Sequence, residues 1–269
     1  MTDTKYIFID VDGTIVDHQN KNIPQNTRKT IHHLLNSGHK LFIASGRARK
    51  IIVTGVEDEF SGYICSLGTN VYCDNKEIYD DPYTDEEIAY IINKAKEYGI
   101  DLSFECKDKG YAYDKMYKRV SEAQKSKAFG DEGDDYWTDE KYPGVKVYKL
   151  MAETDISNED NFNRFNEAIS HITDVCDSSR GNLKAEEVCR KNHSKGHAIK
   201  ALADMGVIDI ENTIAIGDSS NDITMLKTAK IGIVMGQAED YVKETGDIIT
   251  DTISNDGFYK AFKKLGLID

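Results

Sequence analysis

The chain has 269 residues, of which 39% are hydrophobic and 30% are charged, and its formal net charge is −13. This balance is typical of a globular protein with a sizeable core, and the length suits one large domain or a domain with an insert. The acidic charge argues against nucleic acid and anionic membrane surfaces as partners. A small phosphorylated substrate is compatible with this charge, because a bound metal ion can reverse the electrostatic potential at the site.

Cysteine usage and hydropathy predict a cytoplasmic protein. The five cysteines include no C-x-x-C pair, which favours buried reduced thiols over a zinc site or a disulfide framework. Residues 1–5 are too short and too polar to be a signal peptide. No apolar run approaches the roughly 18 residues that a membrane-spanning helix needs.

The first apolar run, residues 6–9, is followed by two closely spaced aspartates. Asp10 and Asp12 come directly after it, and Gly13 allows a sharp turn. Aspartate is depleted in strands, and a buried carboxylate needs a partner or a metal. We therefore expect a strand that delivers two carboxylates to one edge of a sheet, although an Asp-rich turn is the alternative interpretation.

Strands and helices alternate over the next stretch. Pro24 opens a predicted helix, and residues 41–44 form a second strand that ends at Ser45-Gly46-Arg47. Residues 63–65 are predicted to form a third strand, and residues 71–79 a hairpin.

The pattern changes in the middle of the chain. Thr84 begins a capping box, and apolar residues follow it at helical spacing. A second helix is predicted over residues 161–169. Strands are predicted at residues 102–104, 111–113, 145–150, around 175, and at 183–188. Strands grouped with few crossovers predict a separate α+β module.

The alternation resumes after Lys195. Helices are predicted at residues 196–205, around 225, around 241 and at 258–265, with strands at 213–216, 231–234 and 248–249. The fold class is therefore α/β, with a Rossmann-like parallel-sheet core domain at 1–80 and 190–269 and an α+β domain, 81–189, inserted into it.

A second acidic cluster follows the strand at residues 213–216. It contains Asp218, Asn221 and Asp222. Because the carboxyl ends of parallel strands meet at one edge, this cluster is expected to join Asp10 and Asp12. Acids together with a cation and a hydroxyl suit phosphoryl transfer with Mg²⁺, which prefers hard oxygen ligands.

Four motifs in this order resemble those of the haloacid dehalogenase-like (HAD) hydrolases. They are Asp10-Val11-Asp12-Gly13-Thr14, Ser45-Gly46-Arg47, Lys195-Gly196 and Gly217-Asp218-Ser219-Ser220-Asn221-Asp222. The insert between the second and third motifs is similar to the C2 cap of the Cof-type phosphatases. The late runs Val234-Met235-Gly236 and Asp256-Gly257 fit the same group.

The resemblance implies a role for each motif residue. Asp10 would be the nucleophile and Asp12 the general acid and base. The phosphate would be held by Ser45, Gly46, Lys195 and Asn221. Mg²⁺ would be bound by the Asp10 carboxylate, the Asp12 backbone carbonyl and Asp218. Asp222 would support the site through water or by orienting Lys195, and Arg47 would contact substrate or cap.

Each of these residues also has a structural interpretation. Ser45 could be a helix N-cap, Lys195 a solvated surface charge and Arg47 a partner in a surface salt bridge. His193 is expected to face solvent. The family often carries Asn-Gly-Ala after its third strand, where this chain has Ser66-Leu67-Gly68-Thr69-Asn70. The family's substrate preference is therefore not transferred to this chain at these residues.

The function predicted from these residues is that of an enzyme, a Mg²⁺-dependent phosphatase of small phosphorylated metabolites that acts through an aspartyl-phosphate. A phosphomutase would use the same aspartate pair. A catalytically silent metabolite-binding protein is a further alternative. A phospho-acceptor receiver domain fits less well, because it lacks a second acid two residues after the acceptor and has no insert of this size.

Overall fold

The computed structural model describes residues 4–17, 22–52, 60–112, 116–118, 136–179 and 181–268. The chain forms two compact units. The first unit comprises Met1–Gly46, Thr54–Ile78 and Ser194–Asp269, and the second comprises Arg47–Val53 and Tyr79–His193. The second unit thus includes a short segment, Arg47–Val53, which begins at the last residue of the second motif.

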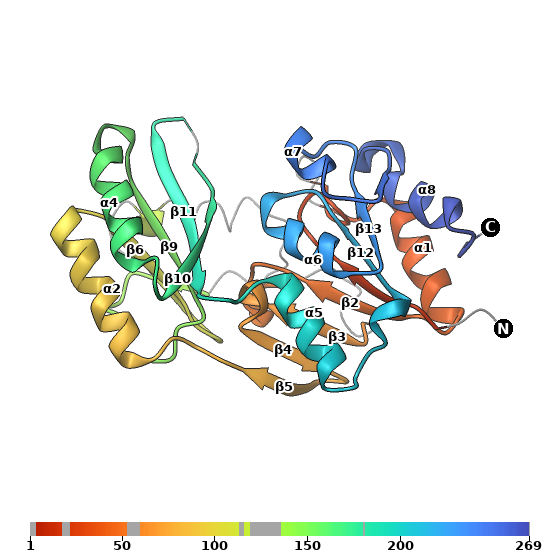
Figure 1. Ribbon diagram of the computed structural model, residues 1–269, viewed down its shortest axis with the longest axis horizontal. Helices are drawn as coiled ribbons and strands as arrows, with labels where there is room; N and C mark the ends of the chain where they lie inside the picture. Colours follow the sequence, from red (N-terminus) through yellow and green to blue (C-terminus); the bar gives the residue numbers. More distant parts are fainter. Residues whose placement is uncertain are drawn as a thin grey trace. The chain divides into compact units, whose positions relative to one another are not determined.

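The first unit is built on a sheet whose described strands follow the order β14-β13-β12-β1-β2-β3-β4-β5 (Figure 1). The bounds are β1 (Tyr6–Ile9), β2 (Lys40–Ala44), β3 (Gly62–Cys65), β4 (Asn70–Cys73), β5 (Lys76–Asp80), β12 (Thr213–Gly217), β13 (Ile231–Val234) and β14 (Ile248–Ile249). From β14 to β3 every neighbouring pair is parallel, and β4 returns antiparallel to β3.

Strand β1 lies in the interior of this sheet, between β12 and β2. Its residues Ile7, Phe8 and Ile9 have no exposed surface. Such a strand is covered on both faces, which explains why its sequence is continuously apolar rather than alternating. Ile9 pairs with Ile216 of β12 and with Ile43 of β2, so the three strands end at nearly the same level.

Helices cover this sheet. The chain crosses from β1 to β2 in one direction across the sheet and from β12 to β13 in the other. The helices are α1 (Gln25–Asn36), α5 (Lys195–Asp204), α6 (Ile223–Thr228), α7 (Asp240–Lys243) and α8 (Gly257–Lys264). Because β-α-β connections are right-handed, the β1-α1-β2 and β12-α6-β13 crossovers place their helices on opposite faces. Helix α1 packs against α8, and α5 packs against α6. The crossover direction reverses between β1 and β12, and sheets of this kind bind ligands beyond the strand ends at such a point.

The second unit is an α+β module with its own sheet, in the order β10-β11-β9-β6-β7-β8. Its strands are β6 (Asp101–Glu105), β7 (Gly110–Tyr111), β8 (Trp137–Thr138), β9 (Lys149–Asp155), β10 (Thr173–Asp177) and β11 (Leu183–Arg190). Its two longer helices, α2 (Asp85–Tyr98) and α4 (Glu159–Ile169), pack on this sheet around Phe104, Leu150 and Val188. The predicted capping box at Thr84 is present, because the Glu87 N–H donates to Thr84 Oγ1 over 3.2 Å.

Short 3₁₀ turns complete the described chain. They are η1 (Arg49–Ile51), η3 (Ser66–Gly68), η5 (Ile156–Asn158), η6 (Ile210–Asn212), η7 (Ser220–Asp222) and η8 (Ile253–Asn255). Of the helices that the structure describes, none is long and apolar enough to cross a membrane.

The predicted fold class, an α/β core with an inserted α+β module, is confirmed. Two details differ. The strand predicted from residue 145 begins only at Lys149. His193, expected in solvent, is only 7% exposed, and its Nε2 lies 3.0 Å from both Tyr79 Oη and Asp81 Oδ2. A hydrophobic pattern does not reveal such a polar burial, because histidine is also common on surfaces.

Candidate active site

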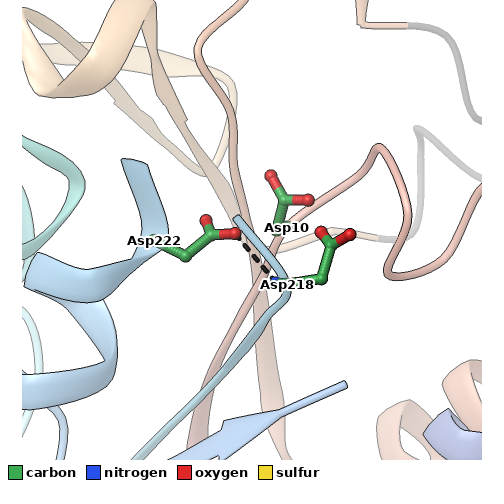
Figure 2. A group of neighbouring side chains, drawn as sticks. All are labelled: Asp10, Asp218 and Asp222. Carbon is green, nitrogen blue, oxygen red and sulfur yellow. Dashed lines mark hydrogen bonds between the residues drawn. The ribbon is translucent and has the colours of Figure 1, made fainter. Parts of the chain in front are cut away.

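The ends of β1 and β12 bring two aspartates together. Asp10 follows β1, and its N–H donates to the Ile216 carbonyl of β12 over 3.0 Å. Asp218 follows Gly217, the last residue of β12. Figure 2 shows that the side chains of Asp10, Asp218 and Asp222 gather at this edge. One carboxylate oxygen from each lies within 4.8 Å of the others.

Lys195 joins two of these carboxylates. Its Nζ donates to Asp10 Oδ1 over 2.7 Å and to Asp222 Oδ1 over 2.6 Å. Lys195 opens helix α5, where the Ser194 hydroxyl caps the first turn by accepting from the His197 N–H over 3.1 Å. The lysine has no exposed surface. It is therefore a buried, paired cation rather than a surface charge.

Asp222 holds the loop that follows β12 as well as the lysine. Its Oδ2 accepts from the N–H groups of Asp218 and Ser219, each over 3.0 Å, and from Ser219 Oγ over 3.1 Å. Together with Ser219 it forms a capping box at the start of η7. Asp222 thus fixes the backbone from which Asp218 extends. Its side chain has no exposed surface, as its role as an organising residue requires.

Two residues that were not predicted as site residues orient Asp218. Thr14 Oγ1 donates to Asp218 Oδ1 over 3.4 Å. Gln237 Nε2 donates to the Gly13 carbonyl over 2.5 Å and approaches Asp218 Oδ2 at 3.5 Å. The Gln237 carbonyl oxygen in turn accepts from the Ile253 N–H over 3.1 Å. The sequence gives no spacing signal for Gln237, because this contact depends on where the chain after β13 lies.

Gly13 is required where the first motif passes Asp218. Its φ is +89°, in the region that glycine adopts freely, and a Cβ atom there would collide with the Asp218 carboxylate. The turn is closed by Val11, whose carbonyl accepts from the Val16 N–H over 2.8 Å. This tight turn explains how the carboxylates of neighbouring strands can approach so closely.

The site holds more buried negative charge than its one lysine can compensate, and this shifts the pKa values of its residues. Burial raises the pKa of Asp10 well above its ordinary value; Asp222 raises it further, and Lys195 opposes the shift. Burial, followed by Asp222, raises the pKa of Asp218 to about 7. For Lys195, burial alone would lower the pKa, but Asp10 and Asp222 raise it overall. A single lysine among three aspartates leaves an excess of negative charge that a cation could balance.

Asp12, Ser45 and Gly46 also lie near the ends of β1 and β2. Asp12 is half-buried in the turn after β1. Ser45 directly follows β2 and is 2% exposed; its N–H donates to the Ile64 carbonyl over 2.8 Å. Gly46 is the next residue along the chain. The structure thus places Ser45 at the end of the strand beside β1.

An unusual turn follows β3 beside Ser45. Ser66, Leu67 and Gly68 have positive φ angles of 47°, 58° and 96°, and the Leu67 N–H donates to the Ser45 carbonyl over 3.3 Å. Left-handed conformations are costly for residues other than glycine. A Cβ atom at Gly68 would collide with the Ser194 carbonyl, so this turn packs tightly against the start of α5.

Asn221, predicted to bind phosphate, and Arg47, predicted to contact substrate or cap, differ in placement. Asn221 is half-buried in η7, where its Oδ1 accepts from Ser219 Oγ over 3.0 Å. Arg47 belongs to the second unit and is half-buried there. Direct contacts therefore connect Asp10, Lys195, Asp218 and Asp222, whereas Arg47 belongs to the other compact unit.

Comparison with known proteins identifies this arrangement. Residues 7–262 match the sequence model of a family described as haloacid dehalogenase-like hydrolase. The chain belongs to this family. The resemblance drawn from the four motifs is thus confirmed, as is the prediction of an enzyme.

Full-length relatives of the HAD hydrolase include two proteins of Bacillus subtilis (strain 168). YkrA, which carries a provisional phosphatase name, is 32% identical over 99% of both chains. YwtE, named 5-amino-6-(5-phospho-D-ribitylamino)uracil phosphatase, is 25% identical and covers 94% of this chain and 95% of its own. Among solved structures, a sugar phosphatase of HAD subclass IIB has a TM-score of 0.81 at 26% identity, covering 98% of this chain and 100% of its own.

Proposed function

We propose that the chain is a Mg²⁺-dependent phosphatase that hydrolyses small phosphorylated metabolites, such as sugar phosphates or similar monoesters, through an aspartyl-phosphate. The observation that carries this proposal is the buried group formed by Asp10, Lys195, Asp222 and Asp218. A carboxylate fixed by a permanently charged lysine, beside two further acids, suits nucleophilic attack on a phosphoryl group.

Asp10 would act as the nucleophile. Lys195 holds one of its oxygens at 2.7 Å, which leaves the other oxygen of the carboxylate to attack. In the first step the bond between this oxygen and phosphorus forms, and the bond between phosphorus and the leaving-group oxygen breaks. In the second step water attacks the same phosphorus, and the Asp10 carboxylate is released.

Asp12 would carry the proton in both steps. It would first protonate the leaving-group oxygen and then remove a proton from the attacking water. Its half-buried position supports this role, because a proton carrier must reach both substrate and solvent. Asp10 and Asp12 would thus have different tasks although only one residue separates them.

The phosphate would be held at the ends of β2 and β12 and at the start of α5. Ser45, the backbone at Gly46, Asn221 and Lys195 would bind its oxygens. Donors that are already fixed by the fold lower the energy of the transferring group most effectively, because they need no rearrangement during reaction. Ser45 meets this condition through its 2% exposure and its place directly after a core strand.

The donor set of the site fits Mg²⁺. Magnesium prefers hard oxygen ligands, and the Asp10 carboxylate, the Asp12 backbone carbonyl and Asp218 would supply them. When bound, it would neutralise charge on the phosphate and on the carboxylates. The raised pKa values of Asp10 and Asp218 support this assignment, because they reflect buried negative charge that lacks full compensation. Thr14 and Gln237 would hold Asp218 in the orientation that binding needs.

The second unit would act as the cap that selects the leaving group, in line with the proposed division into a catalytic domain, 1–80 and 190–269, and a cap domain, 81–189. Cap closure in such enzymes excludes bulk water and commits the substrate. The names of YwtE and of the subclass IIB sugar phosphatase support a substrate with a hydroxyl-bearing carbon chain. Arg47 would contribute a contact to the substrate or the cap.

A cytoplasmic location is also proposed. Among the described residues no two cysteines form a disulfide bond, and Cys65, Cys106 and Cys189 are buried. Buried thiols outside disulfide bonds are typical of proteins kept in reducing compartments. The net charge of −13 supports a small-molecule substrate rather than nucleic acid or an anionic membrane as the partner.

A panel of phosphorylated metabolites, assayed for phosphate release with and without Mg²⁺, tests the proposal. We expect turnover of p-nitrophenyl phosphate and of some sugar phosphates, and loss of turnover with EDTA. Full activity in EDTA would refute the metal role. A transferred phosphate without free phosphate would instead identify a phosphomutase, and binding without any turnover would identify a silent metabolite-binding protein.

A further inference from the structure

Two late runs of the chain meet on one peptide group of the first unit. They are Val234-Met235-Gly236 and Asp256-Gly257. The Gly236 N–H donates to the Asp251 carbonyl over 3.0 Å. A Cβ atom at Gly236 would come within 2.9 Å of the Asp251 carbonyl carbon, and one at Gly257 within 2.0 Å of the oxygen. Both positions therefore need glycine, because the Asp251 backbone packs directly against them.

The segment after Asp251 forms a closed turn. It contains η8, and Asp256 follows η8 with a φ of +58°. The Asp256 N–H donates to the Ile253 carbonyl over 3.3 Å, and the Gly257 N–H donates to the Thr252 carbonyl over 2.9 Å. A left-handed backbone costs energy at residues other than glycine, although Asp and Asn adopt it more readily than most. The turn therefore keeps a conformation that its surroundings have to stabilise.

Helix α1 supplies one stabilising contact. Asn26, in the first turn of α1, donates from Nδ2 to Asp256 Oδ2 over 2.9 Å. Asp256 directly precedes α8, and α1 packs against α8. Since α1 follows the first motif along the chain, this contact attaches the turn to the segment that carries the proposed nucleophile, Asp10.

Ile253 in this turn sets the orientation of the Gln237 side-chain amide. Its N–H donates to Gln237 Oε1 over 3.1 Å. A backbone N–H can only donate, so the amide oxygen must face Ile253 and the NH₂ group must point the other way. There, Gln237 Nε2 lies 2.5 Å from the Gly13 carbonyl oxygen and 3.5 Å from Asp218 Oδ2. A carbonyl and an ionised carboxylate can only accept, so this orientation satisfies both ends of the amide.

The opposite orientation of the Gln237 amide would be unfavourable at both ends. Its oxygen would face the Asp218 carboxylate, and its NH₂ group would face the Ile253 N–H, so that acceptors meet acceptors and donors meet donors. Loss of a partner that orients a metal ligand typically weakens metal binding by about 10- to 100-fold. A change that moves the Ile253 N–H away from Gln237 should therefore also loosen Asp218.

We propose that Asp256, together with Gly236 and Gly257, positions Gln237 so that its NH₂ group holds Asp218 in the orientation that binds Mg²⁺. Asp256 is a positioning residue, because it acts through the turn and touches neither metal nor substrate. The involvement of Mg²⁺ rests on the function proposed above, whereas the orientation of the Gln237 amide does not.

Isothermal titration of Asp256 variants with Mg²⁺ tests the proposal. Asp256→Ala removes the contact with Asn26 and should weaken Mg²⁺ binding by about 3- to 30-fold, the range for residues that act on a site through others. Asp256→Asn keeps an oxygen for Asn26 and adopts the left-handed backbone, so it should bind Mg²⁺ like the wild type. The matched control is Asn75→Ala, because Asn75 is exposed in the turn between β4 and β5 with a φ of +59°. Equal Mg²⁺ affinity in Asp256→Ala and Asn75→Ala would overturn the proposal.

A double variant distinguishes positioning from a general loss of stability. If Asp256 acts through Gln237, Asp256→Ala should cause no further loss of Mg²⁺ affinity when it is added to Gln237→Leu. Losses that add up would show that Asp256 acts independently of Gln237, and they would overturn the proposal. Asp256→Gly takes the place of Asp256→Ala if the alanine variant does not fold, because glycine adopts the left-handed backbone freely.

Nuclear magnetic resonance of the metal-free protein separates this inference from the proposed function. The signal of the Gln237 NH₂ group, assigned by its absence in Gln237→Leu, should shift in Asp256→Ala and stay in place in Asp256→Asn and Asn75→Ala. Such a shift in a protein that binds no Mg²⁺ would retain the positioning of Gln237 and refute the Mg²⁺-dependent phosphatase. An unshifted signal in Asp256→Ala would refute the positioning role, even in a protein that proves to be a Mg²⁺-dependent phosphatase.

Discussion

Lys195 and Asp10 are 185 positions apart in the chain, yet Lys195 Nζ lies 2.7 Å from Asp10 Oδ1 in the protein interior. Their side chains are 0% and 8% exposed. The same ammonium group also binds Asp222. Segments far apart in the sequence are therefore joined at a point where removal of the lysine charge leaves two buried carboxylates without their cation.

Replacement of this lysine should destabilise the protein strongly. Lys195→Met leaves Asp10 and Asp222 without their cation, which typically costs about 3–5 kcal/mol of unfolding free energy. Urea unfolding measures this loss, and Lys200→Met, on the exposed side of α5, is the matched control. The double variant Lys195→Met/Asp222→Asn should recover part of the loss. An unchanged unfolding midpoint in Lys195→Met would contradict the buried ion pairs.

Gln237 should affect metal binding without touching the phosphate. Gln237→Leu removes the hydrogen bond to the Gly13 carbonyl and the contact with Asp218. Loss of such a partner typically weakens metal binding by about 10- to 100-fold. Isothermal titration with Mg²⁺ measures this change, and Gln25→Leu, at an exposed position in α1, is the control. Equal Mg²⁺ affinity in both variants would argue that Gln237 has no positioning role.

Two glycines allow the cost of a left-handed backbone to be measured separately from the cost of a steric collision. Gly13 and Gly38 have φ angles of +89° and +84°, but a Cβ atom at Gly38 meets nothing within 4 Å, whereas one at Gly13 meets the Asp218 carboxylate. Alanine at either position should cost about 1–2 kcal/mol for the left-handed backbone. Only Gly13→Ala should also weaken Mg²⁺ binding, because it displaces Asp218. Similar Mg²⁺ affinity in the two alanine variants would contradict this packing.

Metal-free protein should lose stability as the pH rises. The pKa of Asp218 is raised from 3.8 to about 7 in the folded state, so the folded protein binds this proton more tightly than the unfolded chain. The stabilisation is complete below the unfolded value and declines as the pH rises through about 7. Unfolding free energies of wild type and Asp218→Asn, measured without metal, give this contribution as a difference. If the difference in unfolding free energy between wild type and Asp218→Asn stayed constant between pH 3.8 and about pH 7, the raised pKa of Asp218 would be contradicted.

The sequence predicted the parts of the site that follow core strands. Asp10, Ser45 and Asp218 stand directly after apolar runs, and parallel strands bring such positions to one edge. Gln237 could not be predicted, because its position in a loop carries no periodicity and its partners lie in a distant turn. The contact between Asn26 and Asp256 was equally hidden, because 230 positions separate the two residues in the chain.

If Asp10 is the nucleophile, the enzyme cannot turn over without its carboxylate. Phosphate release from p-nitrophenyl phosphate is compared between wild type and Asp10→Asn, with Mg²⁺ present in both. Because asparagine has the same shape and removes a buried charge, the variant should stay folded, which thermal unfolding verifies. We expect the rate of Asp10→Asn to fall to the background rate. A folded Asp10→Asn that retains wild-type turnover would contradict it.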